Sequence, residues 1–458
     1  MNFQKTNKSL TPRIFQGTFF KYSFVISTVL ASAVSVNAET LLQVYEHAKQ
    51  NDAQLKISER GFLAALEAKP QVLSALKPQL TLSSGVNYGM QYQGKRSFRG
   101  EDTAAFLSLS YDLNLTKVII NKQLDARVSQ VDASILQSKA LLEADRQNLI
   151  IRVAEAYFNY LNANDTLAFR KSEKNAIGRQ LNQVKAFFEA GRSAITDVKE
   201  AQASYDLSVA QVEVANQQID VAREALRAIT TRYYKHLNGA ADNVPLLVPK
   251  PANIEAWAKA AVNNSKALIA AKHAVEVAQK NIDYERAAKK GTLSLVANQG
   301  GDSVLGEDAY DSDKIDASVG IRYSLPLYEG GNISSRVREA RHKLHQAQQT
   351  VELQKRLATQ RSRAAYLAIV SGLAQVKALK QALNSSQTAA SATQAGFEAG
   401  TRTAVDVLLA LRNTFSARRN YTSARYSFLL NTLKLKQASG TLAESDLVAL
   451  SKLLRKKT

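Results

Sequence analysis

The sequence contains no cysteine and only seven prolines among 458 residues. Without cysteine, disulfide frameworks, zinc–thiolate centres and cysteine nucleophiles are excluded. No proline stands within 79–244 or after Pro326, and this favours unusually long helices because proline normally ends them. No apolar run reaches the roughly 18–20 residues that a membrane-spanning helix needs. The composition therefore disfavours a set of compact domains and a polytopic helical membrane protein.

The first 38 residues have the pattern of a secretory signal peptide. Four basic residues precede an apolar stretch over 24–36, and small residues stand just before Glu39. This order is typical of a cleaved leader, so we expect 1–38 to be removed. An uncleaved amphipathic start is the alternative. Export argues against nucleic acid as the partner of this basic chain, whose net charge is +20, and favours a solvated surface or contact with anionic lipid headgroups.

One sequence pattern occurs twice, 209 residues apart. Phe-Glu-Ala-Gly at 188–191 recurs at 397–400, and Ala-Tyr at 156–157 recurs at 365–366. A constant offset indicates an internal duplication, with repeats 39–248 and 249–450 and a basic tail at 451–458. Within the repeats, 117–230 and 332–437 predict long helices that fold into antiparallel pairs at glycine-containing breaks. A dimeric coiled coil with no further role is the alternative.

Each repeat also contains two stretches in which apolar and polar residues alternate. They predict β-hairpins at 79–116 and 292–328. Alternation over about ten residues is typical of outer-membrane strands, whereas a soluble sheet with one wet face is the alternative. Four strands cannot close a barrel, since spanning barrels start at about eight. The chain must then oligomerise, with eight strands in a dimer or twelve in a trimer.

Several short segments, spread over nearly all of 39–450, form a recognisable pattern when taken in order. They are Leu42-Gln43-Val44-Tyr45, Ala194-Ile195-Thr196-Asp197-Val198, Ser324-Leu325-Pro326-Leu327-Tyr328-Glu329-Gly330-Gly331, Gly400-Thr401-Arg402-Thr403, Val405-Asp406-Val407, Ala424-Arg425-Tyr426, Gly440-Thr441-Leu442 and Asp446-Leu447. In this order they resemble the TolC family of outer-membrane efflux proteins. The resemblance implies an α+β membrane protein, a homotrimer whose 12-stranded outer-membrane β-barrel continues into a long periplasmic α-helical barrel. It also implies a channel for multidrug efflux and type I secretion that is surrounded by outer-membrane lipid and works with a periplasmic adaptor and an inner-membrane transporter.

The resemblance further implies a latch that closes the periplasmic entrance. Arg402 matches the linking arginine, Thr196 and Asp197 match its acceptors, and Gln180 matches the glutamine paired with that aspartate. Phe397 departs from the family pattern, because a tyrosine normally stands there and adds a hydroxyl link. We therefore expect this entrance to be less tightly shut than that of a family member with the tyrosine.

An acidic ring is implied at the same end, where the family has two aspartates three residues apart. Asp406 matches the first, but Leu409 stands at the second. A plain solvated helix residue is the alternative interpretation of Asp406. At the other end of the second helical pair, Pro326, Gly330 and Gly331 predict a strand that ends and turns into a helix, since proline cannot donate to a ladder and glycine permits a tight bend.

No enzyme active site, cofactor site or metal site is predicted. His342 and His345 share a helix face but have no nearby acid other than Glu339, and the pair Gly300-Gly301 lacks a phosphate-loop pattern. The rival function is a periplasmic coiled-coil adaptor or scaffold that bridges two membranes without forming a channel. An exported basic coiled coil that binds nucleic acid or a cell-wall polyanion ranks last.

Overall fold

The computed structural model describes residues 38–93, 102–240, 246–306 and 312–455. The predicted signal peptide lies outside these residues apart from Ala38, as do 456–458 of the predicted basic tail. In the rest of that tail, Lys452 lies in the last turn of a helix, and Arg455 lies in a short strand that pairs with Gly239.

The order of the elements is the same in the two halves of the chain. The first half contains α1 (Leu41–Asn51), α2 (Ala53–Ser74), β1 (Gln79–Gln93), β2 (Asp102–Ile120), α3 (Lys122–Glu189), α4 (Ile195–Thr230) and the short β3 (Gly239–Ala240). The second contains α5 (Ile254–Asn264), α6 (Lys266–Ala287), β4 (Thr292–Gly306), β5 (Ser312–Ser324), α7 (Asn332–Glu398) and α8 (Ala404–Ala438). The helix α9 (Glu444–Leu453) and the strand β6 (Leu454–Arg455) follow.

Single capping residues separate the short helices of each half. Asp52 stands between α1 and α2, where its carboxylate accepts a hydrogen bond from the Leu55 amide at 2.7 Å and two from Arg152 of α3 at 2.7 and 2.9 Å. Burial opposes ionisation of Asp52, but these hydrogen bonds leave its pKa lowered. Ser265 plays the same capping part between α5 and α6. Each half thus has a two-part helix beside a long one.

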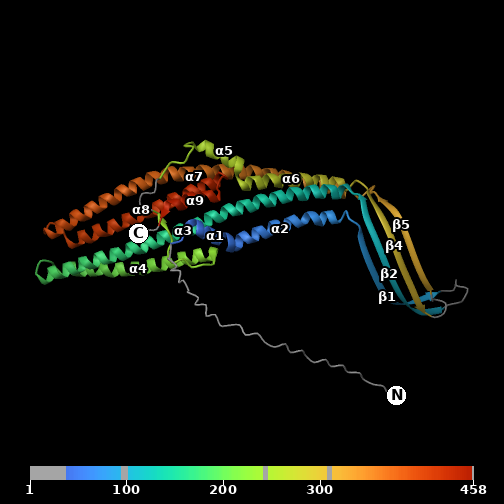
Figure 1. The fold of residues 1–458 in the computed structure, drawn as a ribbon, viewed down its shortest axis with the longest axis horizontal. Coiled ribbons are helices and arrows are strands. Elements are labelled where there is room, and N and C mark those ends of the chain that lie inside the picture. Colours follow the sequence, from blue (N-terminus) through green and yellow to red (C-terminus); the bar gives the residue numbers. More distant parts are fainter. Residues whose placement is uncertain (1–37, 94–101, 241–245, 307–311, 456–458) are drawn as a thin grey trace, which may run out of the picture. The chain divides into compact units, whose positions relative to one another are not determined.

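The long helices pack side by side over different parts of their length. α3 contacts α2 and α6 near the sheet and contacts α4 and α8 further on, while α7 contacts α6, α5 and α8 (Figure 1). At 1.5 Å per residue the 68 residues of α3 span about 100 Å. The strands therefore lie at one end of α3 and the α3–α4 connection lies at the other. In the described ranges, no helix has both the length and the apolar character needed to cross a membrane.

The largest apolar core lies where α1, α9 and the ends of α4 and α8 meet the middle of α3. Leu41, Tyr157, Leu226, Leu435 and Leu447 are each at most 1% exposed there. The hydroxyl of Tyr157 donates to the carbonyl of Asn238 at 2.7 Å and so joins α3 to the segment before β3. This core holds the chain's described ends against the long helices.

The four long strands form one antiparallel sheet in the order β1-β2-β4-β5. One row across the sheet pairs Leu80, Leu115, Ala297 and Val319, and the next pairs Thr81, Asn114, Asn298 and Ser318. Because successive side chains point to opposite faces, this register gathers most apolar side chains on one face and most polar ones on the other, although Gln299, Ser303 and Asp313 interrupt the apolar face. Within the described chain, β1 and β5 each leave one edge unpaired.

The strand ends differ from the predicted hairpin limits. β2 runs to Ile120 rather than ending at 116, because Val118 and Ile120 favour extended backbone and continue the pairing with β4, with a register shift between them. The predicted helix start at 117 is therefore wrong, and α3 begins at Lys122. β5 ends at Ser324 rather than at 328, since Pro326 has no N–H to donate.

A buried ion cluster joins α3 to α8. The Glu173 carboxylate, 3% exposed, accepts from Arg170 at 2.9 Å and from Arg419 of α8 at 2.8 Å. Two partly buried guanidinium groups thus share one buried carboxylate. Removing that carboxylate would leave both cations without their partner, which is strongly destabilising for buried pairs.

We expect Glu173→Gln to lower the free energy of unfolding by about 3–5 kcal/mol, because it keeps the side-chain size but leaves two cations uncompensated. Glu143→Gln is the matched control, since Glu143 makes an exposed ion pair of the same spacing with Arg146 on the same helix. Its loss should cost less than about 1 kcal/mol. Urea unfolding followed by circular dichroism measures both, and equal effects would contradict the structural role of Glu173.

Candidate functional site

The candidate site lies at the tips of the two long helical pairs, where α3 turns into α4 and α7 turns into α8. Gly191 and Gly400 have φ angles of +70° and +77° there, values that suit glycine. The amide of Gly191 donates to the carbonyl of Phe188 at 2.9 Å, and that of Gly400 to Phe397 at 3.1 Å. The two tips are thus built alike, 209 residues apart.

Asp406 caps the first turn of α8. Its carboxylate accepts from the Thr403 amide at 3.0 Å and from the Thr403 hydroxyl at 2.9 Å, and that hydroxyl accepts from the Asp406 amide at 3.2 Å. These hydrogen bonds hold the pKa of Asp406 below its usual value. The lowered pKa means that the cap contributes stability at neutral pH and loses it only as the pH falls through that lowered value.

Asp197 has the equivalent position at the start of α4. Its carboxylate accepts from the Ser193 hydroxyl at 2.7 Å and from the Ala194 amide at 3.2 Å. The family resemblance predicted an acidic ring at Asp406 and a latch acceptor at Asp197, and the capping role of both aspartates was not predicted. The signal was present, because Thr403 followed three residues later by an acid is a helix-start pattern.

Arg402 extends across the tip of the second pair, beside Gly396. A Cβ at Gly396 would lie 2.8 Å from Cγ of Arg402, so the missing side chain makes room for the arginine stem. Arg402 and Thr196 are exposed, and among the described residues Arg402 makes no ion pair. A single chain therefore does not bring Arg402 together with Asp197.

Gln180 is buried in α3, with 4% of its surface exposed, and its Nε2 has no hydrogen-bond partner among the described residues. The expected pairing of Gln180 with Asp197 is not made within the chain, since the Asp197 carboxylate is occupied by Ser193 and Ala194. Gln180 instead follows the buried Glu173 by seven residues along α3. Both polar side chains thus lie on the buried side of the helix.

Phe397 belongs to an apolar cluster beneath the tips. Its ring stacks on Phe187 of α3 at 5.4 Å between centroids, and Val184 and Val407 pack in the same cluster. The phenylalanine thus joins the two helical pairs by packing. Leu409, one turn beyond Asp406 on α8, remains 55% exposed.

The predicted strand-to-helix turn lies at the opposite end of α7. Pro326 falls in the irregular segment after β5, and Gly330 and Gly331 have φ angles of +58° and +84° just before α7 starts. The first half has no such segment. There Asn121 alone separates β2 from α3, and its side chain accepts from two amides of the first turn.

Within the part of the chain that the structure describes, no three histidine, aspartate or glutamate side chains gather as metal ligands would. His345 contacts Gln348 at 3.2 Å on its own helix. The polar groups at the tips are arranged as caps and exposed side chains.

Comparison with known proteins gives the family. The model of the family described as "Outer membrane efflux protein" matches residues 44–232 and again 257–441, once in each half. Outer membrane protein TolC of Escherichia coli is 34% identical over 433 residues, which cover 92% of this chain and 86% of that protein. Alkaline protease secretion protein AprF of Pseudomonas aeruginosa is 27% identical over 420 residues, which cover 89% and 85%.

Among solved structures, the CmeC outer membrane channel of Campylobacter jejuni matches with a TM-score of 0.74 at 18% identity and covers 91% of this chain and 90% of that one. The structural match shows the fold, and the family match extends over both halves with their strands and helical tips. The chain belongs to the outer membrane efflux protein family.

Proposed function

We propose that three copies of this chain close one barrel in the outer membrane and one helical tunnel below it. The observation that carries the proposal is the sheet, whose predominantly apolar face extends over four long strands while β1 and β5 keep open edges. In lipid an unpaired edge leaves backbone groups without hydrogen bonds, so β5 of one copy must pair with β1 of the next.

The family resemblance favours three copies over two, and three give twelve strands. The long helices α3 and α7 follow the strands β2 and β5 after connections of one and seven residues, so they would form a continuous wall below the barrel. A tube of this kind is a conduit. The protein is an outer-membrane channel for efflux and type I secretion, with its helical part in the periplasm, and it works without catalysis of its own.

The partners follow from this position. A channel that crosses only the outer membrane needs an energy source elsewhere, so we assign it a periplasmic adaptor and an inner-membrane transporter. The cargo comprises small toxic compounds, proteins or both. The rival function, an adaptor that forms no channel, does not account for the apolar sheet face: Leu80, Val319 and Ile321 are 65%, 78% and 70% exposed in the chain.

We expect Val319→Arg to reduce the amount of assembled trimer, because arginine on the lipid-facing side near the middle of a spanning strand costs about 2–4 kcal/mol. Ser318→Arg is the matched control on the opposite face of β5 and should assemble normally. Heat-modifiable migration of outer-membrane extracts reports assembly, and the mass in detergent should correspond to three chains. Equal loss in both variants, or a stable monomer, would contradict the barrel.

The helix tips form the periplasmic entrance in this proposal. Arg402 lies at the α7–α8 tip, where it is exposed and makes no ion pair within the described chain. Thr196 and Asp197 lie at the α3–α4 tip. We assign the latch to contacts between copies, where Arg402 reaches these acceptors across the boundary. Exposed links of this kind are individually weak, which suits an entrance that must open.

Arg402→Ser should raise the single-channel conductance in planar bilayers, because it removes a link that holds the entrance. Lys199→Ser removes one positive charge near the other tip, from a side chain without an ion pair in the described chain, and should leave the conductance nearly unchanged. An unchanged conductance in Arg402→Ser would show that this arginine does not hold the entrance.

Three copies of Asp406 would place an acidic ring at the entrance and favour cations. Asp406→Asn should abolish block by trivalent cations applied from the periplasmic side, since it removes the charge but keeps an oxygen that can still cap α8. Leu409→Asp should strengthen the block, because it adds a second ring one turn away. Bilayer recordings test both, and block that persists in Asp406→Asn would place the constriction elsewhere.

A further inference from the structure

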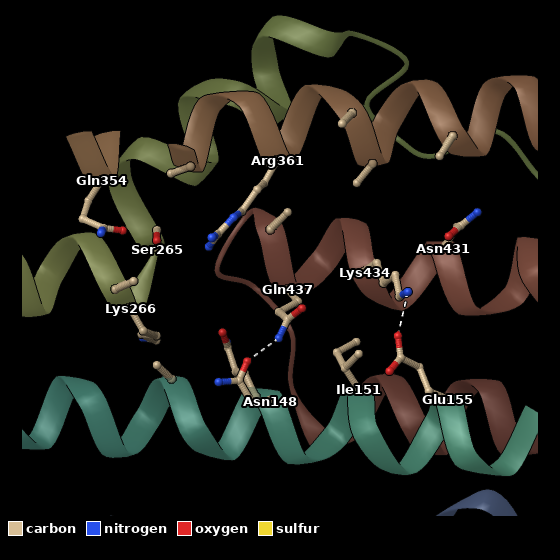
Figure 2. Close-up of a pocket in the computed structure, with 18 residues that line it drawn as sticks. Asn148, Ile151, Glu155, Ser265, Lys266, Gln354, Arg361, Asn431, Lys434 and Gln437 are labelled. Atoms are coloured by element: carbon tan, nitrogen blue, oxygen red, sulfur yellow. Dashed lines mark hydrogen bonds and ion pairs between the residues drawn. The ribbon is translucent and has the colours of Figure 1, made fainter. Parts of the chain in front are cut away.

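A cavity of about 630 Å³ lies between α3, the start of α6, α7 and the end of α8. Seven alanines and Ile151 supply the apolar part of its lining, and the other ten lining residues are polar or charged (Figure 2). Volumes of this size hold drug-sized ligands in other proteins. The cavity lies far from the helix tips and belongs to one chain.

The charges around the cavity do not balance. Lys266, Arg361 and Lys434 face a single carboxylate, Glu155, which is bound to Lys434 at 2.7 Å. Among the described residues neither Arg361 nor Lys266 makes an ion pair. By contrast Arg363, two residues further along α7, binds both oxygens of Glu255 at 2.9 and 3.0 Å.

The start of α6 adds to the positive potential. Lys266 is the first residue of this helix, whose first turn contains no acid, whereas α5 has Glu255 in its first turn. A helix start carries partial positive charge, so a lysine there is unfavourable without a nearby anion. Ser265 is the N-terminal cap of α6. Figure 2 shows Arg361 reaching from α7 into the space beside Ser265.

Neutral hydrogen-bonding groups complete the lining. The amide of Gln437 donates to Asn148 at 2.8 Å, and Gln147 donates to the carbonyl of Leu442 at 2.9 Å. Gln354 of α7 makes no hydrogen bond among the described residues and projects toward Ser265 in Figure 2. The cavity thus offers two uncompensated cations, a free amide and an alanine-lined wall.

We propose that this cavity binds an amphipathic organic anion, with its acidic group on Arg361 and Lys266 and its apolar body against the alanines. Asn148 lies 26 residues after the start of α3, about 40 Å from the strands at 1.5 Å per residue. The ligand is therefore a free soluble anion rather than a membrane lipid held in the bilayer. All the groups that line the cavity belong to one chain.

The absence of cysteine permits a direct test. Ala364→Cys places the only thiol of the chain in the cavity wall, and its alkylation by the neutral reagent N-ethylmaleimide is measured on the purified full-length protein in a non-ionic detergent. Octanesulfonate should slow the reaction at least about tenfold. Octyltrimethylammonium at the same concentration should slow it less than twofold, since it has the same chain and the opposite charge.

Two further variants assign the charge. Adding Arg361→Gln and Lys266→Gln should weaken protection by octanesulfonate about tenfold, as expected for two charges about 6 Å from the bound anion in a water-like dielectric. Adding Lys377→Gln, a charge change on α7 outside the cavity, should leave protection intact.

A lipid control distinguishes a soluble anion from a membrane lipid. Phosphatidylglycerol in the micelles should not protect the thiol.

Three results would overturn the proposal. Equal protection by both amphiphiles would show a merely apolar cavity, and no protection by either would show no site. Protection that survives the loss of Arg361 and Lys266 would place the anion elsewhere. Circular dichroism of each variant checks the fold, and channel recordings of the same preparations test the proposed function separately.

Discussion

Backbone hydrogen bonding at the edges of the sheet is the constraint on which the rest of the structure depends. The apolar face formed by rows such as Leu115, Ala297 and Val319 suits lipid, and lipid offers no partner for the open edges of β1 and β5. Closing the sheet between copies, as we propose, would also arrange the helices, because β2 is joined to α3 by Asn121 alone and the other strand–helix connections are short. The need to pair the open edges of the sheet would therefore also fix the positions at which the long helices start.

The periodic features of the fold could be predicted from the sequence because they depend on local residue order. The alternation of apolar and polar residues predicted the strands. The 209-residue offset predicted two related halves, and in the structure the long helices and strands follow the same order in both. The strand ends could not be predicted as well. Ile120 extends β2 through pairing with a distant strand, and Pro326 ends β5 earlier than the hydrophobic pattern suggests.

The candidate site was harder to predict, because its side chains take part in contacts that the pattern does not reveal. Asp406 and Asp197 were recognised as important acids, but their hydrogen bonds to Thr403 and Ser193 make them helix caps first. Glu173 gave no signal at all. A glutamate in a charged helix is normally solvated, and its burial follows from the approach of Arg419 on α8, 246 residues away. Such contacts depend on tertiary packing rather than on local order.

In the proposed channel, the tips of the helical pairs would move while the middle stays fixed, because strong and weak contacts are distributed unevenly along the pairs. Near the middle, Glu173 joins α3 to α8 through buried ion pairs, and Tyr157 lies in the largest core. At the tips, the small cluster around Phe397 is the last buried contact, and Arg402 is exposed beyond it. Because exposed links stabilise by at most about 1 kcal/mol each, the links that we assign to Arg402 between copies would break at far less cost in free energy than the buried contacts of the middle. The capped helix starts would remain intact during such a movement, since the hydrogen bonds of Asp406 and Asp197 are made within their own tips.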